Sequence, residues 1–435
     1  MRKSLALVSL SLGIVLINTI WSAVAQVPIP LPVPTIPLIQ PPVQPKPSIP
    51  LIQPSVQPKP SIPNIQPSQV LKPLNLGKNC TPIHACLGWD EQLWGQGGNF
   101  GGGDRQALLS SIDNSLSYLT RNSAIATYKK YPVKGITHDR VRRSLIRFRQ
   151  LVVNSKSPAE LQAAVRREFT FYKSVGNDGN GTVKFTAYYE PIYSASRVKT
   201  QEYKYPLYRV PPDLDQWAKP HPKRVDLEGQ DGLLGERSQL RGLEILWFRD
   251  RFDAYMVHIQ GSAQIQLSDG KKTSVGFAGG TDYPWTSIGG QLSKDGKLAA
   301  NQLNMPGIIN FFQSYPQEMS NYLPRWERFV FFQETSGRPA TGSINVPVTP
   351  ERSIATDKSL MPPGALALVH TSFPYPTSNG QMQYRTVSRF ALDQDTGSAI
   401  KGPGRVDYFM GSGKVAGDRA GVTGGKGSLY YLLLK

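Results

Sequence analysis

The chain has 435 residues, of which 39% are hydrophobic and only 18% are charged, so its body has the composition of a globular protein. Two cysteines exclude a disulfide-dense scaffold and a cysteine-rich zinc module. The formal net charge of +18 favours a polyanionic partner, although surplus lysine and arginine also simply keep a protein soluble. No nucleic-acid-binding signature accompanies the charge, which leaves cell-wall polymer and membrane headgroups as anionic partners.

The first 25 residues predict a secretory signal peptide. Two basic residues precede an apolar run over 5–21, and Ala23-Val24-Ala25 supplies the small residues of a cleavage site. The alternative is an uncleaved membrane anchor, for which the run is short. We therefore expect an exported protein that resides in the periplasm or cell envelope, which includes association with the outer membrane.

Residues 26–75 are predicted to form a proline-rich linker. The segment 37–49 (PLIQPPVQPKPSI) recurs almost unchanged at 50–62, and residues 27–73 hold 16 of the 37 prolines. Proline removes backbone donors, so such a repeat favours extended polyproline II over helix or sheet. The segment is either a spacer, with cell-wall or envelope partners of its own, or an inert tail.

Cys80 and Cys86 are separated by five residues, and in an exported chain this spacing predicts a local disulfide. No further ligands cluster near them, and the five histidines show no metal-binding spacing. We therefore predict neither a metal ion nor another cofactor.

The residue pattern of the remaining chain changes once, from helical to strand-like. Residues 104–174 carry apolar positions at helical spacing, and Ser157-Pro158 is typical of a helix start. From Val183 onward, short β-branched and aromatic runs alternate with glycine, proline and aspartate, which predicts a helical N-terminal stretch followed by one or two β-barrels. The runs taken as strands are 184–189, 254–259, 329–332, 365–369 and 384–391.

Carboxylates are the remaining candidates for catalysis, because the chain lacks a zinc-hydrolase motif, a nucleophile elbow and a phosphate loop. Asp407 lies inside an apolar strand pattern, where burial would raise its pKa as a general acid requires. Asp395 lies twelve residues earlier, and a hairpin through 402–404 would turn both side chains toward one cavity. Asp357 lies upstream as a third candidate.

Each aspartate also has a purely structural interpretation. Asp395 opens an Asp-Thr-Gly sequence and is equally consistent with a turn residue. Asp407 is alternatively the partner of Lys401 or Arg405 in an ion pair.

The chain from Phe185 to its end resembles the membrane-bound lytic murein transglycosylase A family, including a C-terminal three-aspartate (3D) domain. Ala187 and Ala263 stand where the family usually has glycine, and a lipid-anchor cysteine is missing. The segments that carry the resemblance are 185–191 (FTAYYEP), 205–209 (YPLYR), 260–262 (QGS), 286–289 (TSIG), 352–355 (RSIA), Asp357, 363–364 (PG), 395–397 (DTG), 399–402 (AIKG) and Asp407.

The resemblance implies a mainly β protein with N-terminal helices, in which a double-psi β-barrel is interrupted by a smaller inserted β-barrel. The helical part of the first barrel would span 76–189, the insert 190–340 and the completing 3D part 341–435. A groove for a peptidoglycan glycan strand would lie between the barrels, and we expect a monomer that does not bind nucleic acid.

The resemblance also implies a lyase that cleaves the β-1,4 bond between N-acetylmuramic acid and N-acetylglucosamine and leaves 1,6-anhydromuramic ends. Asp407 would be the only acid and base, with Asp395 and Asp357 in support. A hydrolytic muramidase that uses Asp395 with Asp407 and a non-catalytic wall-binding module are the alternatives. The expected substrate-binding residues are Thr186, Tyr188, Tyr189, Glu190, Gln260, Gly261, Ser262, Lys401 and Gly402.

Overall fold

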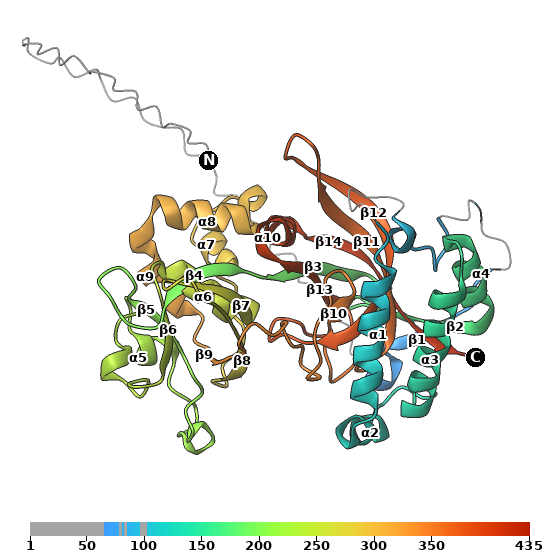
Figure 1. Cartoon of the computed structure of the whole chain (residues 1–435), viewed down its shortest axis with the longest axis horizontal. Coiled ribbons are helices and arrows are strands. Elements are labelled where there is room, and N and C mark those ends of the chain that lie inside the picture. Colours follow the sequence, from blue (N-terminus) through green and yellow to red (C-terminus); the bar gives the residue numbers. More distant parts are fainter. Residues whose placement is uncertain (1–64, 78–80, 82–84, 96–101) are drawn as a thin grey trace, which may run out of the picture. The chain divides into compact units, whose positions relative to one another are not determined.

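The computed structural model describes residues 65–77, 81, 85–95 and 102–435 (Figure 1). The described residues belong to one compact unit, Pro60–Lys435. The predicted signal peptide, most of the proline-rich linker and Cys80 lie outside the described residues. The disulfide between Cys80 and Cys86 therefore stays a prediction.

The N-terminal part of the unit is helical, as predicted. Helices α1 (Arg105–Leu119), α2 (Asn122–Lys129), α3 (His138–Asn154) and α4 (Pro158–Glu168) follow one another. Ser157 caps α4 by accepting a hydrogen bond from the Glu160 amide. The helical prediction reaches too far, because Phe169–Ser174 is strand β2. Its Phe-Thr-Phe-Tyr sequence favours a strand, and β2 pairs with β1 (Leu71–Leu74).

Six strands of the first sheet close into a barrel. The strand order is β1-β2-β14-β11-β12-β10-β13-β3, and β3 pairs back to β14. This closure confirms the predicted mostly β architecture with a barrel. The barrel strands are β3 (Val183–Glu190), β10 (Ser353–Ala355), β11 (Leu366–Pro376), β12 (Met382–Asp395), β13 (Arg405–Ser412) and β14 (Gly425–Leu434).

The predicted hairpin between Asp395 and Asp407 is wrong. Strand β10 lies between β12 and β13 and pairs with β12 in parallel and with β13 in antiparallel orientation. The turn through 402–404 therefore connects two strands that are not neighbours. A strand of only three residues, more than thirty residues upstream, gives too weak a sequence signal to predict its insertion.

The second sheet has the order β5-β6-β4-β7-β8-β9. A single bridge between Arg209 and Phe332 links its two edges. Figure 1 shows β3 of the barrel continuing into β4 of this sheet, across Pro191. The strands are β4 (Ile192–Ser196), β5 (Tyr205–Tyr208), β6 (Glu244–Phe248), β7 (Ser262–Leu267), β8 (Lys272–Gly280) and β9 (Val330–Glu334).

The predicted strand at 254–259 is instead part of helix α6 (Arg251–Gln260). Asp250 starts this helix by accepting hydrogen bonds from the amides of Phe252, at 2.6 Å, and Asp253, at 3.1 Å. Nearly all of α6 is buried, so its apolar run has neither helical nor strand periodicity, and periodicity alone does not separate the two.

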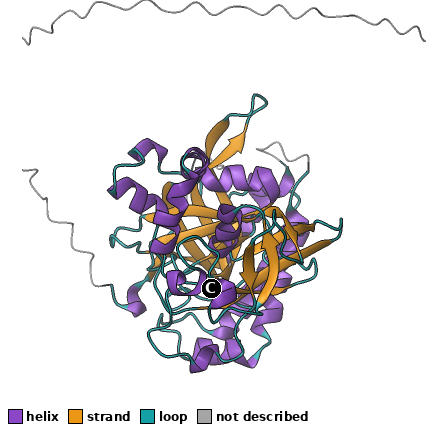
Figure 2. Ribbon diagram, turned by 90° about the vertical axis from the view of Figure 1, so that its left-hand side faces the viewer, coloured by secondary structure: helices purple, strands orange, loops and turns teal. Residues whose placement is uncertain are grey.

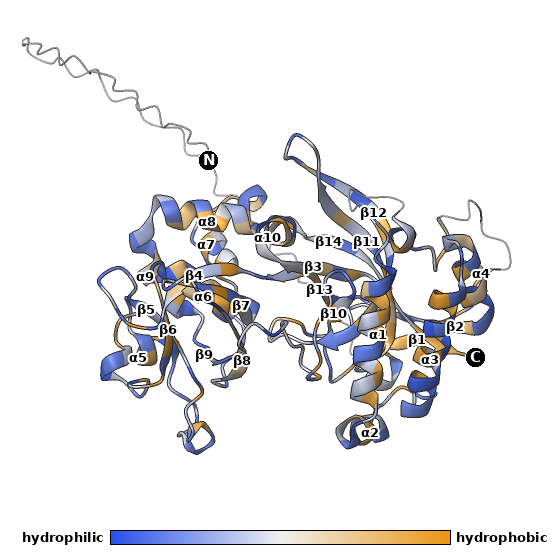
Figure 3. Ribbon diagram, in the orientation of Figure 1, coloured by the Kyte–Doolittle hydropathy of each residue, from blue (hydrophilic) through white to orange (hydrophobic). Residues whose placement is uncertain are grey.

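The other helices are α5 (Arg224–Glu228), α7 (Ile288–Lys294), α8 (Met305–Ser314), α9 (Met319–Tyr322) and α10 (Gly413–Val422). Figure 2 shows helices packed around the strands. Figure 3 shows apolar and polar residues side by side on α1, which buries Leu108 and Ile112 in the barrel core. A separate core, which includes Phe248 and Phe332, fills the second sheet. In the described part of the chain, every helix is too short or too polar to span a bilayer.

Candidate active site

Four side chains form a row across neighbouring strands of the barrel. Asp395 on β12 and Asp407 on β13 both align with Ala355 on β10, and Asp407 also aligns with Thr186 on β3. Residues aligned across a sheet lie on the same face. The row is therefore Asp395, Ala355, Asp407 and Thr186, and only the methyl group of Ala355 separates the two carboxylates. We call these four residues the aspartate row.

A β-bulge places Asp395 in this row. Asp393 aligns with Ile354, but the next residue of β10 aligns with Asp395, so Gln394 is the extra residue. Without the bulge, Asp395 would share a face with the fully buried Asp393. Bulges beside functional sites often redirect a side chain in this way.

Asp407 is half-buried and lies between the core residues Val406 and Tyr408 of β13. Thr186 Oγ1 donates a hydrogen bond of 2.5 Å to Asp407 Oδ1. Burial raises the pKa of Asp407, the hydrogen bond from Thr186 and the charge of Arg405 oppose this rise, and the charge of Asp395 adds to it. The net effect is a pKa of Asp407 above the ordinary value of an aspartic acid.

The sequence also suggested an ion pair of Asp407 with Lys401 or Arg405. Among the described residues, neither cation forms a salt bridge with Asp407, so that interpretation is wrong. Lys401 is exposed, and its charge acts on Asp357. Arg405 lowers the pKa of Asp407 through its charge without forming an ion pair with it.

Asp395 is held by three donors. Tyr188 Oη donates to Oδ2 at 2.8 Å, while the amides of Ser343 and Thr396 donate to Oδ1 at 2.9 and 2.8 Å. Burial raises the pKa of Asp395, although these hydrogen bonds and the charge of Lys358 work against the rise. The Tyr188 ring also packs against Phe409 of β13, with ring centroids 5.1 Å apart.

Asp357 is not part of the aspartate row and binds a different segment. It is buried and accepts hydrogen bonds from Ser359 Oγ at 2.6 Å and from the Gly402 amide at 2.9 Å. Burial opposes its charge, but these hydrogen bonds and the charge of Lys401 hold the pKa of Asp357 below its usual value. Asp357 thus braces the segment that leads into β13, and its support of the aspartate row stays a prediction.

Gly402 has a structural reason to be glycine. Its φ of +82° is in the left-handed region, and a Cβ atom there would lie 2.4 Å from Asn177 Oδ1. The φ of Gly402 and the closeness of Asn177 thus explain why this position is a glycine, without involving a ligand.

The other predicted binding residues lie where the end of β3 meets the second sheet. The Tyr189 amide donates to Gln260 Oε1 at 3.1 Å, and Gly261, with φ of +81°, ends α6 immediately before Ser262 begins β7. Glu190 is buried and accepts hydrogen bonds from Gln264 and Ser412. These residues therefore fix β3 to its neighbours.

The side chains of β3 alternate between two faces. Thr186 and Tyr188 point toward the two aspartates, whereas a Cβ on Gly417 of α10 would lie 2.7 Å from the Tyr189 ring. The structure thus gathers Thr186 and Tyr188 at the aspartate row and places Tyr189 on the other face. Binding of substrate by any of these residues stays a prediction.

The sequence analysis missed a buried ionic group directly behind the row. Asp393 is fully buried, pairs with Lys358 and accepts hydrogen bonds from Thr356 Oγ1 and Tyr431 Oη. Lys358 Nζ also donates to the backbone carbonyl of Asp395. The signal was present, because Asp393 follows the apolar Ala391-Leu392, as Asp407 follows Val406.

Among the described residues, no three histidine, cysteine, aspartate or glutamate side chains come together as metal ligands would. The polar groups of the site are instead carboxylates, hydroxyls and amides, a set suited to proton transfer and to hydrogen bonding with hydroxyl-rich ligands.

Comparison with known proteins matches two parts of the chain. Residues 184–333 match the MltA specific insert domain, and residues 352–433 match the 3D domain. A membrane-bound lytic murein transglycosylase A homolog of Buchnera aphidicola is 32% identical over 280 residues, which cover 64% of this chain and 73% of the relative. Membrane-bound lytic murein transglycosylase A of Escherichia coli K12 is 30% identical over 259 residues, 59% of this chain and 67% of the relative.

Solved structures show the same fold. A membrane-bound lytic murein transglycosylase of Agrobacterium tumefaciens superposes with a TM-score of 0.59 at 26% identity and covers 76% of this chain and 93% of its own. E. coli MltA with bound chitohexaose gives a TM-score of 0.60 at 24% identity, over 84% of this chain and 94% of its own. The chain thus combines an MltA-type insert with a 3D domain. It belongs to the membrane-bound lytic murein transglycosylase A family, which confirms the resemblance found in the sequence.

Proposed function

We propose that this protein is a peptidoglycan lytic transglycosylase that cleaves the β-1,4 bond between N-acetylmuramic acid and N-acetylglucosamine. It leaves 1,6-anhydromuramic ends, and Asp407 is its single acid and base. The supporting observation is the aspartate row, in which a half-buried carboxyl with a raised pKa lies on the barrel face opposite the core. Family membership supplies the substrate class.

The proposed reaction needs only one carboxyl group. Protonated Asp407 donates its proton to the glycosidic oxygen, and the bond from that oxygen to the anomeric carbon breaks. The C6 hydroxyl of the muramic acid attacks the anomeric carbon and closes the 1,6-anhydro ring. The Asp407 carboxylate takes the proton of this hydroxyl, which returns the acid to its starting state.

Thr186 and Asp395 have supporting roles in this scheme. Thr186 fixes the orientation of the Asp407 carboxyl through its hydrogen bond. The charge of Asp395 helps to keep Asp407 protonated, and Tyr188 and two amides hold Asp395 in place. The hydrogen-bonding groups around the row would contact the sugars.

The hydrolytic alternative would use Asp395 with Asp407. Asp395 and Asp407 lie on strands that are separated by β10, so they are not direct neighbours in the sheet. A hydrolase needs its second carboxylate free to attack the sugar or to activate a water molecule. Both oxygens of Asp395 already accept hydrogen bonds, which favours a positioning role for this residue.

The remaining parts of the proposal follow the family. The closed six-stranded barrel is proposed to have the double-psi topology, and the glycan strand to bind between this barrel and the second sheet. The protein is proposed to work as an exported monomer in the cell envelope. The proline-rich segment would act there as a spacer.

Digestion of purified sacculi followed by mass spectrometry tests the activity. We expect the wild type to release muropeptides that are one water lighter than reducing-end products. The rate of the Asp407→Asn variant should fall at least about 10³-fold, because the proposed acid is gone. Asp139→Asn is the matched control, since its side chain is 70% exposed on α3, and this variant should keep the wild-type rate.

Other outcomes separate the alternatives. Products that carry only reducing ends would identify a muramidase. Pelleting with sacculi without release of fragments would identify a wall-binding module. An Asp407→Asn variant with the wild-type rate would show that Asp407 is not the acid.

A further inference from the structure

Helices α5 and α6 (Figure 1) contribute most of the lining of a small, partly open cavity. None of the residues of the aspartate row lines it. Its volume of about 10 Å³ is close to that of one water-sized sphere. The cavity is lined by Tyr205, Pro206, Arg224, Glu228, Gly232, Arg251, Ala254, Tyr255, His258 and Leu323.

Several donors at this cavity lack an acceptor. Within the described residues, Arg251 Nε, Arg251 Nη2 and Tyr255 Oη are buried and make no hydrogen bond. Arg251 is 8% exposed and Tyr255 is 3% exposed. A buried polar group that is left unpaired destabilises the folded state, and more so when it is charged, so three such atoms in one place point to a missing ligand.

Positive side chains outnumber negative ones in the lining of the cavity. Arg224 and Arg251 are both buried cations, and Glu228 is the one carboxylate that lines the cavity. Glu228 Oε1 lies 3.2 Å from Arg224 Nη1 but 3.8 Å from Arg251 Nη2, so it is committed mainly to Arg224. Burial lowers the pKa of Arg251, the charges of Glu228 and Asp231 oppose this effect, and the charge of Arg224 adds to it. The lining of the cavity thus holds two arginines and one carboxylate.

The histidine at the cavity is a donor as well. His258 Nδ1 lies 3.2 Å from Arg224 Nη2 and accepts a hydrogen bond from the Val330 amide. Arginine and backbone amides can only donate, so Nδ1 is the acceptor and the proton of the neutral ring is on Nε2. Burial lowers the pKa of His258 far below its usual value, which keeps the ring neutral.

We propose that this cavity binds a monatomic halide, chloride under physiological conditions, between Arg251, Tyr255 and Arg224. Donors from several directions and a lining with two arginines and one carboxylate select an anion over a water molecule, which would also have to donate. The small volume excludes sulfate and phosphate.

The halide would hold α6 in place. Arg251 and Tyr255 lie in the first half of α6, and Arg224 lies at the start of α5, so the ion joins the two helices. Gln260 at the other end of α6 accepts the hydrogen bond from the Tyr189 amide. The halide therefore stabilises an element that contacts β3, whatever reaction the aspartate row performs.

Crystals of the wild-type protein grown in bromide provide the decisive test. We expect an anomalous difference peak in the cavity, within hydrogen-bonding distance of Arg251 and Tyr255. A cavity without such a peak, filled by water or empty, would overturn the proposal.

Thermal unfolding measures the affinity. The melting temperature of the wild type should rise with chloride at constant ionic strength when gluconate is the replacement anion. Tyr255→Phe removes one donor but keeps the ring. This variant should need about ten times more chloride than the wild type for the same rise in melting temperature. Tyr322→Phe is the control, since the buried Tyr322 donates to Asp295 elsewhere and its variant should keep the wild-type chloride dependence. Equal chloride dependence in Tyr255→Phe and the wild type would contradict this assignment of the donor.

Discussion

The pKa of Asp407 depends on two neighbours that act in opposite directions. Burial is the largest cause of its rise. The hydroxyl of Thr186 stabilises the ionised form and lowers the pKa, whereas the negative charge of Asp395 disfavours that form and raises it. Because these two residues lie on different sides of Asp407 in the aspartate row, each can be changed alone.

The pH dependence of the activity should show these opposite effects of Thr186 and Asp395 on the pKa of Asp407. A general acid must be protonated, so the rate falls as the pH rises through its pKa. Thr186→Val removes a stabiliser of the carboxylate and should move this alkaline limb to higher pH by about one unit. Asp395→Asn removes a repelling charge and should move the limb to lower pH.

The pH profile of turnover on sacculi, measured for both variants against the wild type, checks this prediction. The two variants serve as controls for each other, because a general loss of structure would not shift the limbs in opposite directions. Shifts in the same direction would show that the limb does not report the ionisation of Asp407.

At the residue scale, the sequence was informative where a charged side chain lies within an otherwise apolar strand pattern. Asp407 stands out among Val406, Tyr408 and Phe409, and the structure places it on the opposite face of β13 from the core. Lys358 did not stand out, because its importance comes from contacts with Asp393 and Asp395, more than thirty residues away. Such contacts depend on pairing between elements, which the local sequence does not contain.

Elements were predictable where the periodicity was clear. Helices α3 and α4 have amphipathic patterns and capping residues, and both begin where their caps indicate. Helix α6 is buried on nearly all sides, so its sequence has no polar face to reveal a period. The three residues of β10 are too few for any pattern, yet they separate β12 from β13 and so determine how the two aspartates lie.

The contribution of Gly402, in the turn before β13, to the stability of the protein can be tested by mutation. Gly402→Ala forces a residue with a side chain into the left-handed region and brings a Cβ atom within 2.4 Å of Asn177 Oδ1. We expect a loss of about 2–4 kcal/mol in the free energy of unfolding, measured in urea, from backbone strain and the displaced side chain together.

Gly270→Ala is the matched control, because Gly270 has a similar φ of +86° but no atom within 4 Å of the added methyl group. It should lose only the backbone part, about 1–2 kcal/mol. Equal losses in the two variants would mean that Asn177 yields without cost and that the turn is not tightly braced.

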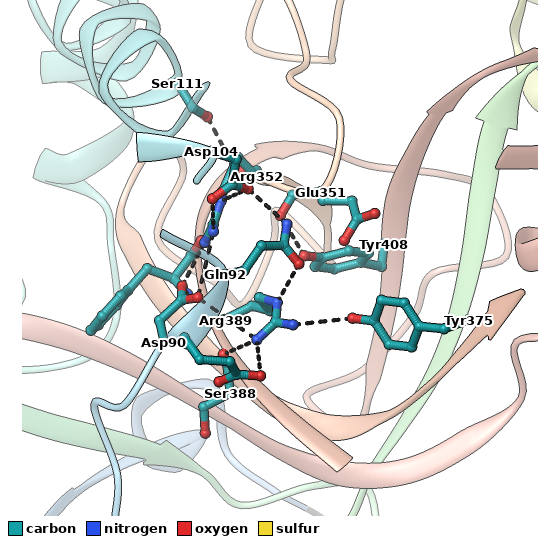
Figure 4. Close-up of polar contacts among 12 residues, drawn as sticks. Asp90, Gln92, Asp104, Ser111, Glu351, Arg352, Tyr375, Ser388, Arg389 and Tyr408 are labelled. Atoms are coloured by element: carbon teal, nitrogen blue, oxygen red, sulfur yellow. Dashed lines mark hydrogen bonds and ion pairs between the residues drawn. The ribbon is translucent and has the colours of Figure 1, made fainter. Parts of the chain in front are cut away.

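At the scale of the whole molecule, a buried ionic cluster joins the segment before α1 to the barrel. Figure 4 shows Asp90, Gln92 and Asp104 beside Arg352 and Arg389. Arg352 lies 2.6 Å from Asp90 and 2.5 Å from Asp104, and Arg389 lies 3.0 Å from Glu91. Both arginines are nearly inaccessible to solvent.

The sequence could not have predicted this cluster. The spacing of Asp90, Glu91 and Asp104 in the sequence does not point to any partner. Their partners are about 250–300 positions further along the chain, so only the folded barrel brings them together. The cluster explains why the chain before α1 packs on the 3D part, and it predicts which ion pairs matter for stability.

Replacing Arg352 should destabilise the whole unit. Arg352→Leu would remove the main partner of the buried Asp90 and of the partly exposed Asp104. Breaking a buried ion pair on one side typically costs about 3–5 kcal/mol. The control is Arg149→Leu, because the side chains of Arg149 and Asp113 are 42% and 49% exposed and such surface pairs contribute only about 0–1 kcal/mol. Urea unfolding of both variants against the wild type measures the difference. Similar small losses would mean that water reaches the cluster and that its charges do not hold Asp90 and Asp104 to the barrel.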